Sequence, residues 1–489
     1  MLAASMTLAP ALLRAVGRGV FWPLSIRQIS PPAPGTPRRK AAEDLGLELE
    51  KGFWPAVARA VLTRPGWILL AVLLILAPLA VRGTSVSITY DLLSELPADR
   101  PSVRGARLLE QFFQPGETGP ITILAEADQP RFAAAEGRRQ IAQLTAQLFQ
   151  FQYIDSTGQQ VQPIVSVRSL VEPLGGPPGS LGLGEGFGKL VAYKHPKAKA
   201  RFLAQAPGYE GRVTRFDLIC RYDPFSRESM RLLEHVEEHL HQLSEDPQSP
   251  WYGIQFHLAG ATAAVRDLAL VTASDQQRIQ RLVVVAVLAV LILILRRVVV
   301  SIVMILSVVF GYFVTMGLTY EVFLWWYGSA FDGLDWKVPI FLFVILIAVG
   351  QDYNIYLATR AFEEERRRGW REGLRVALVR TGGIITSCGV IMAGTFASML
   401  AGSLRAMQEL GFALAMGVLL DTLVIRTVLM PAFLSFWSRW KSGPPEPSLG
   451  EVGPDQQEGP PRQRGEKLPV SLPKPAAAPA EIVRKTAAF

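Results

Sequence analysis

The sequence predicts a membrane α-helical bundle of six spanning helices with an external α+β domain of ferredoxin-like type. The 489 residues are 49% hydrophobic and only 19% charged, whereas a soluble protein of this length carries about 25% charged residues. The apolar residues are concentrated in six long runs. Between the first run and the second lies a stretch of about 200 residues that is too polar for a membrane to hold.

Each apolar run comes close to the length of about 20 residues that a helix needs to cross a bilayer core. The runs are Trp67–Val81, Leu282–Leu295, Val298–Leu318, Val338–Ala358, Gly382–Leu400 and Met407–Phe436. The first two fall short of this length, so we expect them to extend into their polar flanking turns.

Basic residues predict the orientation of these helices, because Lys and Arg flank the cytoplasmic ends of spanning segments. If the six segments alternate, the basic clusters all fall on one side of the membrane. The polar stretch and the loop EVFLWWYGSAFDGLDWK fall on the other side, where the aromatic residues of the loop suit an interfacial belt. We therefore expect cytoplasmic termini and an external large domain.

The polar stretch combines strand and helix patterns. Alternation of apolar and polar residues predicts strands in TSVSITYDL, PITILAEA, VQPIVSVRSL, RVTRFDLICRY and YGIQFHLAG. Helical periodicity predicts helices in SVRGARLLEQFF, AAEGRRQIAQLTAQLFQF and SRESMRLLEHVEEHLHQL. Strands and helices that interleave without a Rossmann pattern suit an α+β domain of ferredoxin-like type.

These patterns divide the chain into consecutive parts. Residues 67–82 are predicted to form the first transmembrane helix, 83–280 the external α+β domain and 281–440 a five-helix transmembrane bundle. Residues 23–66 are interpreted as a cytoplasmic linker. Residues 441–489 are rich in proline and poor in aromatic residues, so we expect a disordered cytoplasmic tail.

The fourth run contains a carboxylate, in the stretch VPIFLFVILIAVGQDYNIYLATR. A charged residue at the centre of a membrane helix costs about 2.5–3.5 kcal/mol, and a carboxylate that alternates between neutral and charged forms gives a two-state switch. We predict a proton relay at Asp352 and Tyr353, whose hydroxyl can bond a carboxylate. Tyr356 lies on the same helix face as Asp352, at i+4. The alternative is that Asp352 reaches cytoplasmic water and only orients the helix.

A second acidic residue, Asp421, lies within the sixth run in GVLLDTLVIRT. Arg426 follows five residues later, a spacing that is not ideal for pairing on one α-helix. Two interpretations stay open for Asp421 and Arg426: a secondary relay, to which Tyr356 is a further candidate, or a structural ion pair that anchors the sixth helix.

Several other motifs do not support a functional site. HVEEH at His235–His239 matches an inverted zinc-peptidase pattern, but its histidines fall on the polar face of an amphipathic helix and no third ligand has the required spacing. GLGEGFGKL lacks two residues that a P-loop requires. The two cysteines, Cys220 and Cys388, imply no disulfide framework. We expect no metal, no cofactor, no catalytic residue and no nucleic-acid partner.

One spanning helix, a large external α+β domain and five clustered helices resemble the half-unit of the resistance–nodulation–division superfamily. Within it, GQDYNIYL, GGIITSCGVIMAGTFASML and GFALAMGVLLDTLVIRTVLMPAF resemble the MmpL family. The resemblance covers Trp67 to about Trp440 and corresponds to the C-terminal half of a family member.

The resemblance implies a proton-coupled transporter of lipid-like or hydrophobic molecules, rather than an enzyme, in the plasma (inner) membrane. The external domain would then be a porter domain. In relatives each half supplies an Asp-Tyr pair and the two pairs face each other, so this chain is expected to act as a homodimer or with a second chain that carries the missing half. The alternatives are a non-transporting lipid-sensing or scaffolding protein, and a non-functional severed half.

Residues 1–22 look like the remnant of a preceding transmembrane helix. Leu8–Leu13 (LAPALL) aligns with Leu429–Leu434 (LMPAFL), and basic and aromatic residues follow both strings. Such an echo is expected where two halves of a transporter are copies. The alternative is an organellar transit peptide or a signal sequence, because residues 1–42 carry six Lys or Arg and no acid.

Overall fold

The computed structural model describes residues 7–8, 11, 14–15, 53–91, 93–154, 158–176, 195–328 and 331–442. All but the first two residues of the tail predicted for 441–489, the GLGEGFGKL string, and most of the remnant (1–22) and the linker (23–66) therefore lie outside the described residues. The described end of that linker range is helical: α3 spans Phe53–Thr63. This helix was not predicted from the sequence.

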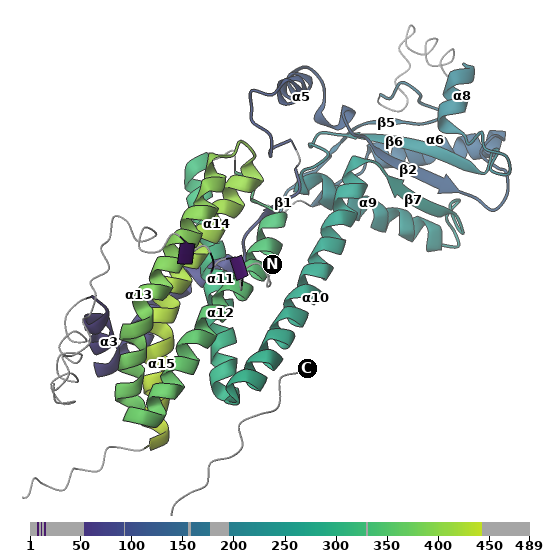
Figure 1. The fold of residues 1–489 in the computed structure, drawn as a ribbon. Coiled ribbons are helices and arrows are strands. Elements are labelled where there is room, and N and C mark those ends of the chain that lie inside the picture. The colour runs from purple at the N-terminus through teal and green to yellow at the C-terminus, as the bar shows by residue number, and fades with distance from the viewer. Residues whose placement is uncertain are drawn as a thin grey trace, which may run out of the picture. The chain divides into compact units, whose positions relative to one another are not determined.

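Six helices in the described part of the chain are long and apolar enough to cross a membrane, which confirms the prediction of six spans (Figure 1). They are α4 (Pro65–Thr84), α10 (Ala261–Leu295), α11 (Val298–Tyr327), α12 (Lys337–Arg368), α13 (Trp370–Ala397) and α14 (Arg405–Leu420). The 3₁₀ turn η4 (Ser398–Ala401) extends α13. The sixth span continues from α14 through the π-helix η5 (Asp421–Leu429) into α15 (Met430–Ser442).

Three of the spans form the centre of the bundle. Of the 18 residues in the most apolar stretch of each span, 56% are buried in α11, 50% in α12 and 61% in the sixth span. The corresponding share is only 17% in α4 and 11% in α10. Helix α4 packs very closely on α11 because both present glycine. A Cβ atom added at Gly83 would lie 1.9 Å from the Phe313 carbonyl oxygen, and one added at Gly317 would lie 2.0 Å from that of Leu79.

Helix α10 crosses the boundary predicted between residues 280 and 281. Its first twenty residues, ATAAVRDLALVTASDQQRIQ, mix apolar residues with polar and charged ones and contain good helix formers, so the helix begins at Ala261 and continues into the apolar run without a break. The helix ends where Arg296 adopts a left-handed conformation with φ of 52°. The basic connection between the fourth and fifth runs is helical as well, because α12 extends to Arg368 and α13 begins at Trp370.

The region between α4 and α10 contains all the strands and helices that the patterns predicted. A four-stranded antiparallel sheet has the order β5-β6-β2-β7. Its strands are β2 (Ile121–Glu126), β5 (Ile164–Arg168), β6 (Val213–Cys220) and β7 (Gln255–Ala259). Helices α6 (Ala135–Phe149) and α9 (Arg227–Glu245) pack on it through one hydrophobic cluster that includes Ile123, Leu144, Phe216 and Leu232.

The smaller elements of this region complete the chain order. They are α5 (Pro101–Phe112), η2 (Pro115–Glu117), α8 (Pro196–Phe202) and the short paired strands β3 (Tyr153–Ile154) and β4 (Gln160–Val161). The histidines of the HVEEH string contact aromatic rings in tilted arrangements: His235 contacts Tyr153 at 4.9 Å and His239 contacts Phe151 at 5.5 Å between ring centroids.

A two-stranded parallel sheet ties the segment that follows α4 to the connection between α11 and α12. Strand β1 (Ile88–Thr89) pairs with β8 (Leu334–Asp335), with Ile88 opposite Leu334 and Thr89 opposite Asp335. We refer to this end of the bundle as the β1–β8 end.

Candidate functional site

Polar side chains from α12 and η5 meet inside the bundle and form what we call the intramembrane polar site: Gln351, Tyr353, Asn354, Asp421 and Arg426. The π-helical geometry of η5 explains the ion pair in this site. A π-helix repeats its hydrogen bonds at i+5, so Asp421 and Arg426 fall on the same face although they are five residues apart. The spacing that is unfavourable on an α-helix is therefore favourable here.

Arg426 is the centre of the intramembrane polar site, and only 1% of its surface is exposed. Its guanidinium donates to Asp421 Oδ2, to the Gly350 carbonyl oxygen at 3.1 Å and to Asn354 Oδ1 at 3.3 Å. It also lies over the ring of Tyr353, at 4.7 Å from the centroid. One cation thus joins η5 to two successive turns of α12.

Four buried polar atoms of the intramembrane polar site have no hydrogen-bond partner among the described residues. They are Gln351 Oε1, Asn354 Nδ2, Asp421 Oδ1 and Arg426 Nη1. Leaving a buried polar atom unbonded costs about 1–3 kcal/mol, and unsatisfied groups that gather in one place are characteristic of functional sites. Water molecules could satisfy these atoms.

Asp352 lies on the opposite side of α12 from these contacts. It is exposed, as are four other residues that follow the same face of the helix: Phe341, Val344, Ala348 and Tyr356. The described residues give Asp352 no hydrogen bond and no ion pair. Tyr356 shares the face of Asp352, as the i+4 spacing predicts, and is 46% exposed.

The structure therefore divides the predicted site residues into two groups. Tyr353, Asp421 and Arg426 meet in the intramembrane polar site, whereas Asp352 and Tyr356 face outward. The Tyr353 hydroxyl contacts Met392 Sδ at 3.4 Å rather than a carboxylate.

Gln351 and Asn354 are buried site residues that the sequence analysis did not single out. Gln351 donates to the Met304 carbonyl oxygen at 3.3 Å and so connects α12 to α11. A signal for both residues was present, because amides three residues apart in an apolar run lie on one helix face. Among the described residues, no group of three or more His, Cys, Asp or Glu side chains is arranged to hold a metal ion.

Comparisons with known proteins agree with this architecture. The sequence model of the MMPL family matches residues 94–453. The chain is 30% identical to the membrane protein ActII-3 of Streptomyces coelicolor over 444 residues, which are 89% of this chain and 50% of that protein. It is 25% identical to the apo-petrobactin exporter of Bacillus anthracis over 442 residues, which are 89% of this chain and 52% of the exporter.

The chain is also similar to a mycobacterial protein over a shorter region. It is 29% identical over 286 residues to MmpL12 of Mycobacterium tuberculosis, which is named as a probable transport protein. These residues are 57% of this chain and 24% of MmpL12. The chain spans about half the length of the first two relatives. Six spans and the match over most of its length show that the chain is a membrane protein that belongs to the MMPL family, a family of transporters rather than enzymes.

Proposed function

We propose that this chain is one half of a proton-coupled membrane transporter that exports lipid-like or hydrophobic molecules. The observation that carries the proposal is the outward position of Asp352 in a spanning helix. A carboxylate that faces lipid costs about 2.5–3.5 kcal/mol. A second set of helices, from a second copy or from another chain, would remove that cost by covering the exposed face of α12.

The lengths of the relatives support this assembly. Two of them are about twice as long as the chain, so a pair of such chains would match their size. The exporter from Bacillus anthracis supports outward transport, and the family supports a hydrophobic substrate class.

The intramembrane polar site supports the proton coupling. Tyr353 is adjacent to Asp352 in the chain, and its ring contacts Arg426. A change of charge on Asp352 can therefore alter the position of Tyr353 and its contact with Arg426 in the interior of the bundle. The unbonded polar atoms beside Arg426 can hold water that carries protons. In this proposal Asp352 and Tyr353 form the relay, and the Asp421–Arg426 pair holds α12 and η5 in register.

The proposed orientation follows the positive-inside rule. The termini are cytoplasmic, the β1–β8 end faces outward, and the bundle spans the plasma (inner) membrane. Residues 83–280 form the external porter domain. The element order β2-α6-β5-β6-α9-β7 and the sheet order β5-β6-β2-β7 support a ferredoxin-like fold for this domain.

Transport of a fluorescent phospholipid in proteoliposomes with an imposed pH gradient tests the proposal. The wild type should move the lipid faster when the gradient is present. Asp352→Asn should reduce the gradient-dependent part to background, because an amide cannot take up and release a proton. Asp332→Asn changes an exposed acidic residue outside the spans and should behave as the wild type.

Two outcomes would contradict the proposal. If Asp352→Asn moves the lipid at the wild-type rate under the gradient, Asp352 is not the relay. If the folded, assembled wild type shows no gradient-dependent movement, the protein is a lipid-sensing or scaffolding module rather than a transporter.

A further inference from the structure

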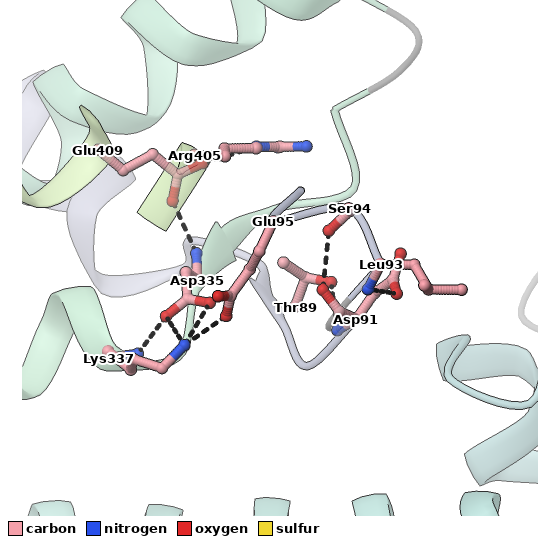
Figure 2. Close-up of polar contacts among 9 residues, drawn as sticks. All are labelled: Thr89, Asp91, Leu93, Ser94, Glu95, Asp335, Lys337, Arg405 and Glu409. Atoms are coloured by element: carbon pink, nitrogen blue, oxygen red, sulfur yellow. Dashed lines mark hydrogen bonds and ion pairs between the residues drawn. The ribbon is translucent and has the colours of Figure 1, made fainter. Parts of the chain in front are cut away.

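A second set of charged residues gathers at the β1–β8 end of the bundle, where Asp335 and Glu409 are buried and the other members are partly buried. We call it the Glu95 cluster: Glu95, Asp335, Lys337, Arg405 and Glu409 (Figure 2). It brings together the segment after β1, strand β8 with the start of α12, and the first turn of α14. No functional role was predicted for any of these residues from the sequence.

A tight turn delivers Glu95 to this cluster. The backbone N–H of Leu93 donates to Asp91 Oδ1 at 2.8 Å, and the Ser94 hydroxyl donates to the Asp91 carbonyl oxygen at 2.9 Å. Figure 2 shows these bonds beside the cluster. The Glu95 carbonyl oxygen then accepts from the backbone N–H of Arg405 at 3.1 Å, and its carboxylate binds Lys337 Nζ. The segment that leaves α4 is thereby fastened to two other helices.

Asp335 is the most heavily bonded residue of the Glu95 cluster and is 4% exposed. Its carboxylate accepts from the backbone N–H of Lys337 at 2.9 Å and from Lys337 Nζ at 3.2 Å. Its backbone N–H donates to Glu409 Oε2 at 2.8 Å, and Glu409 also accepts from Arg405 Nε at 2.9 Å. Asp335 therefore links β8, α12 and α14.

The charges of the Glu95 cluster do not balance when every group is ionised. Three carboxylates face two cations, which leaves one excess negative charge in a poorly solvated place. The carboxyl groups of Glu95 and Asp335 both bind Lys337 Nζ and so lie beside the same ammonium group, and two neighbouring carboxyl groups in a poorly solvated place favour sharing a proton. The groups that face Asp335 are Glu95, Lys337, Glu409, Arg405 through Glu409, and the nearby Tyr90 hydroxyl.

We propose that the Glu95–Asp335 pair is a second proton-binding site, and that protonation of this pair clamps the segment between α4 and α5 to the bundle. The proton comes from the solvent, binds one carboxyl group and forms the hydrogen bond between the two. When it leaves, the two carboxylates repel each other across Lys337, and the pairing of β1 with β8 weakens. This clamp is a property of the chain itself and does not depend on the proposed transport.

The direction of the pH effect follows from the two carboxyl groups. Burial, together with the hydrogen bond to Glu95, raises the pKa of Asp335 to about 6. Burial opposes ionisation of Glu95 too, but its bonds to Asp335 and Lys337 bring its pKa below the usual value. Because the pKa of Asp335 is raised in the clamped state, clamping is strongest in acid and is lost as the pH rises through about 6.

Hydrogen exchange of the paired strands measures the clamp directly in the full chain, reconstituted in lipid nanodiscs. The informative amides are those of Leu334 and Trp336, which donate to the Ser87 and Thr89 carbonyl oxygens at 2.9 and 3.2 Å. After correction for intrinsic exchange rates, their protection in the wild type should fall about tenfold between about pH 5 and about pH 7.5.

The variant Asp335→Asn keeps the shape of the side chain and removes the titration. It should show the same protection at both pH values, close to that of the wild type in acid, whereas Asp332→Asn should follow the wild type. A carboxyl band in infrared difference spectra should titrate near pH 6 in the wild type and in Asp332→Asn, and should be absent from Asp335→Asn.

Two results would overturn the proposal. One is protection at Leu334 and Trp336 that does not depend on pH in the wild type. The other is a folded Asp335→Asn protein whose protection and infrared band still titrate near pH 6, because the proton would then reside on another group.

Discussion

Arg426 is the side chain on which the interior of the bundle depends most. It is fully enclosed, it pairs with Asp421, and it donates to a backbone carbonyl and an amide of α12. A buried ion pair adds little stability compared with apolar residues of the same volume, but removal of one partner leaves the other charged and unpaired. Variants that change one partner or both therefore show whether the ion pair itself stabilises the protein or whether only an unpaired buried charge destabilises it.

Arg426→Ala should lower the free energy of unfolding by about 3–5 kcal/mol, because Asp421 would be left buried without its cation. Unfolding in increasing concentrations of sodium dodecyl sulfate measures this loss. The double variant Asp421→Leu with Arg426→Met removes both charges and should recover most of the stability. A loss below about 1 kcal/mol in Arg426→Ala would show that Asp421 finds another partner and that the ion pair does not hold the two helices together.

The acidic residues of the bundle and of its β1–β8 end were predictable from the sequence to different degrees. Asp352 and Asp421 stand out in the sequence as acids within apolar runs, and their presence in spanning helices is observed. Glu409 offers the same signal in MQELGFALAM but lies at the start of its run, where a charged residue costs less and draws less attention. Asp335 and Glu95 carry no local signal, because only the pairing of β1 with β8 brings them together.

At the scale of elements, the contact between α4 and α11 positions the start of the segment that enters the Glu95 cluster. The two helices approach each other through Gly83 and Gly317, where even one added carbon would overlap a backbone carbonyl oxygen. Membrane helices use such glycines to gain packing contacts that the bilayer cannot supply. Even a methyl group added at either glycine would therefore disrupt the contact between α4 and α11.

Gly317→Ala should separate α4 from α11 and destabilise the protein by about 1–3 kcal/mol, the usual cost of overpacking. The midpoint of thermal unfolding in detergent measures this effect. Gly394→Ala in α13 is the matched control, because a Cβ atom there would meet nothing within 4 Å. An unchanged midpoint for Gly317→Ala would contradict the close packing of the two helices.

The elements also show where sequence patterns stop being informative. Apolar length located the six spans, because the bilayer imposes it. It could not locate the polar first half of α10, since a helix that leaves the membrane no longer needs apolar residues. Nor could it identify η5 as a π-helix, because an i+5 pair is not part of α-helical periodicity.

At the scale of the whole molecule, the central claim concerns the exposed face of α12. Four residues of this face can contact lipid at little cost: Phe341, Val344, Ala348 and Tyr356. Asp352 lies among them, and contact of its carboxylate with lipid is unfavourable. The chain spans about half the length of two relatives that it matches over 89% of its own length. Both facts are explained together if a second set of helices covers this face.

A photoreactive amino acid in place of Ala348 tests this claim most directly, in cells that contain the protein in its native membrane. Ala348 is exposed and lies one turn before Asp352 on the same face, and Leu293 of α10, 76% exposed, is the matched control. Mass spectrometry after irradiation should find position 348 joined to a second copy of the chain or to a second MMPL-family chain, and position 293 joined to lipid. Lipid adducts alone at both positions would show that Asp352 faces the bilayer and would contradict the account.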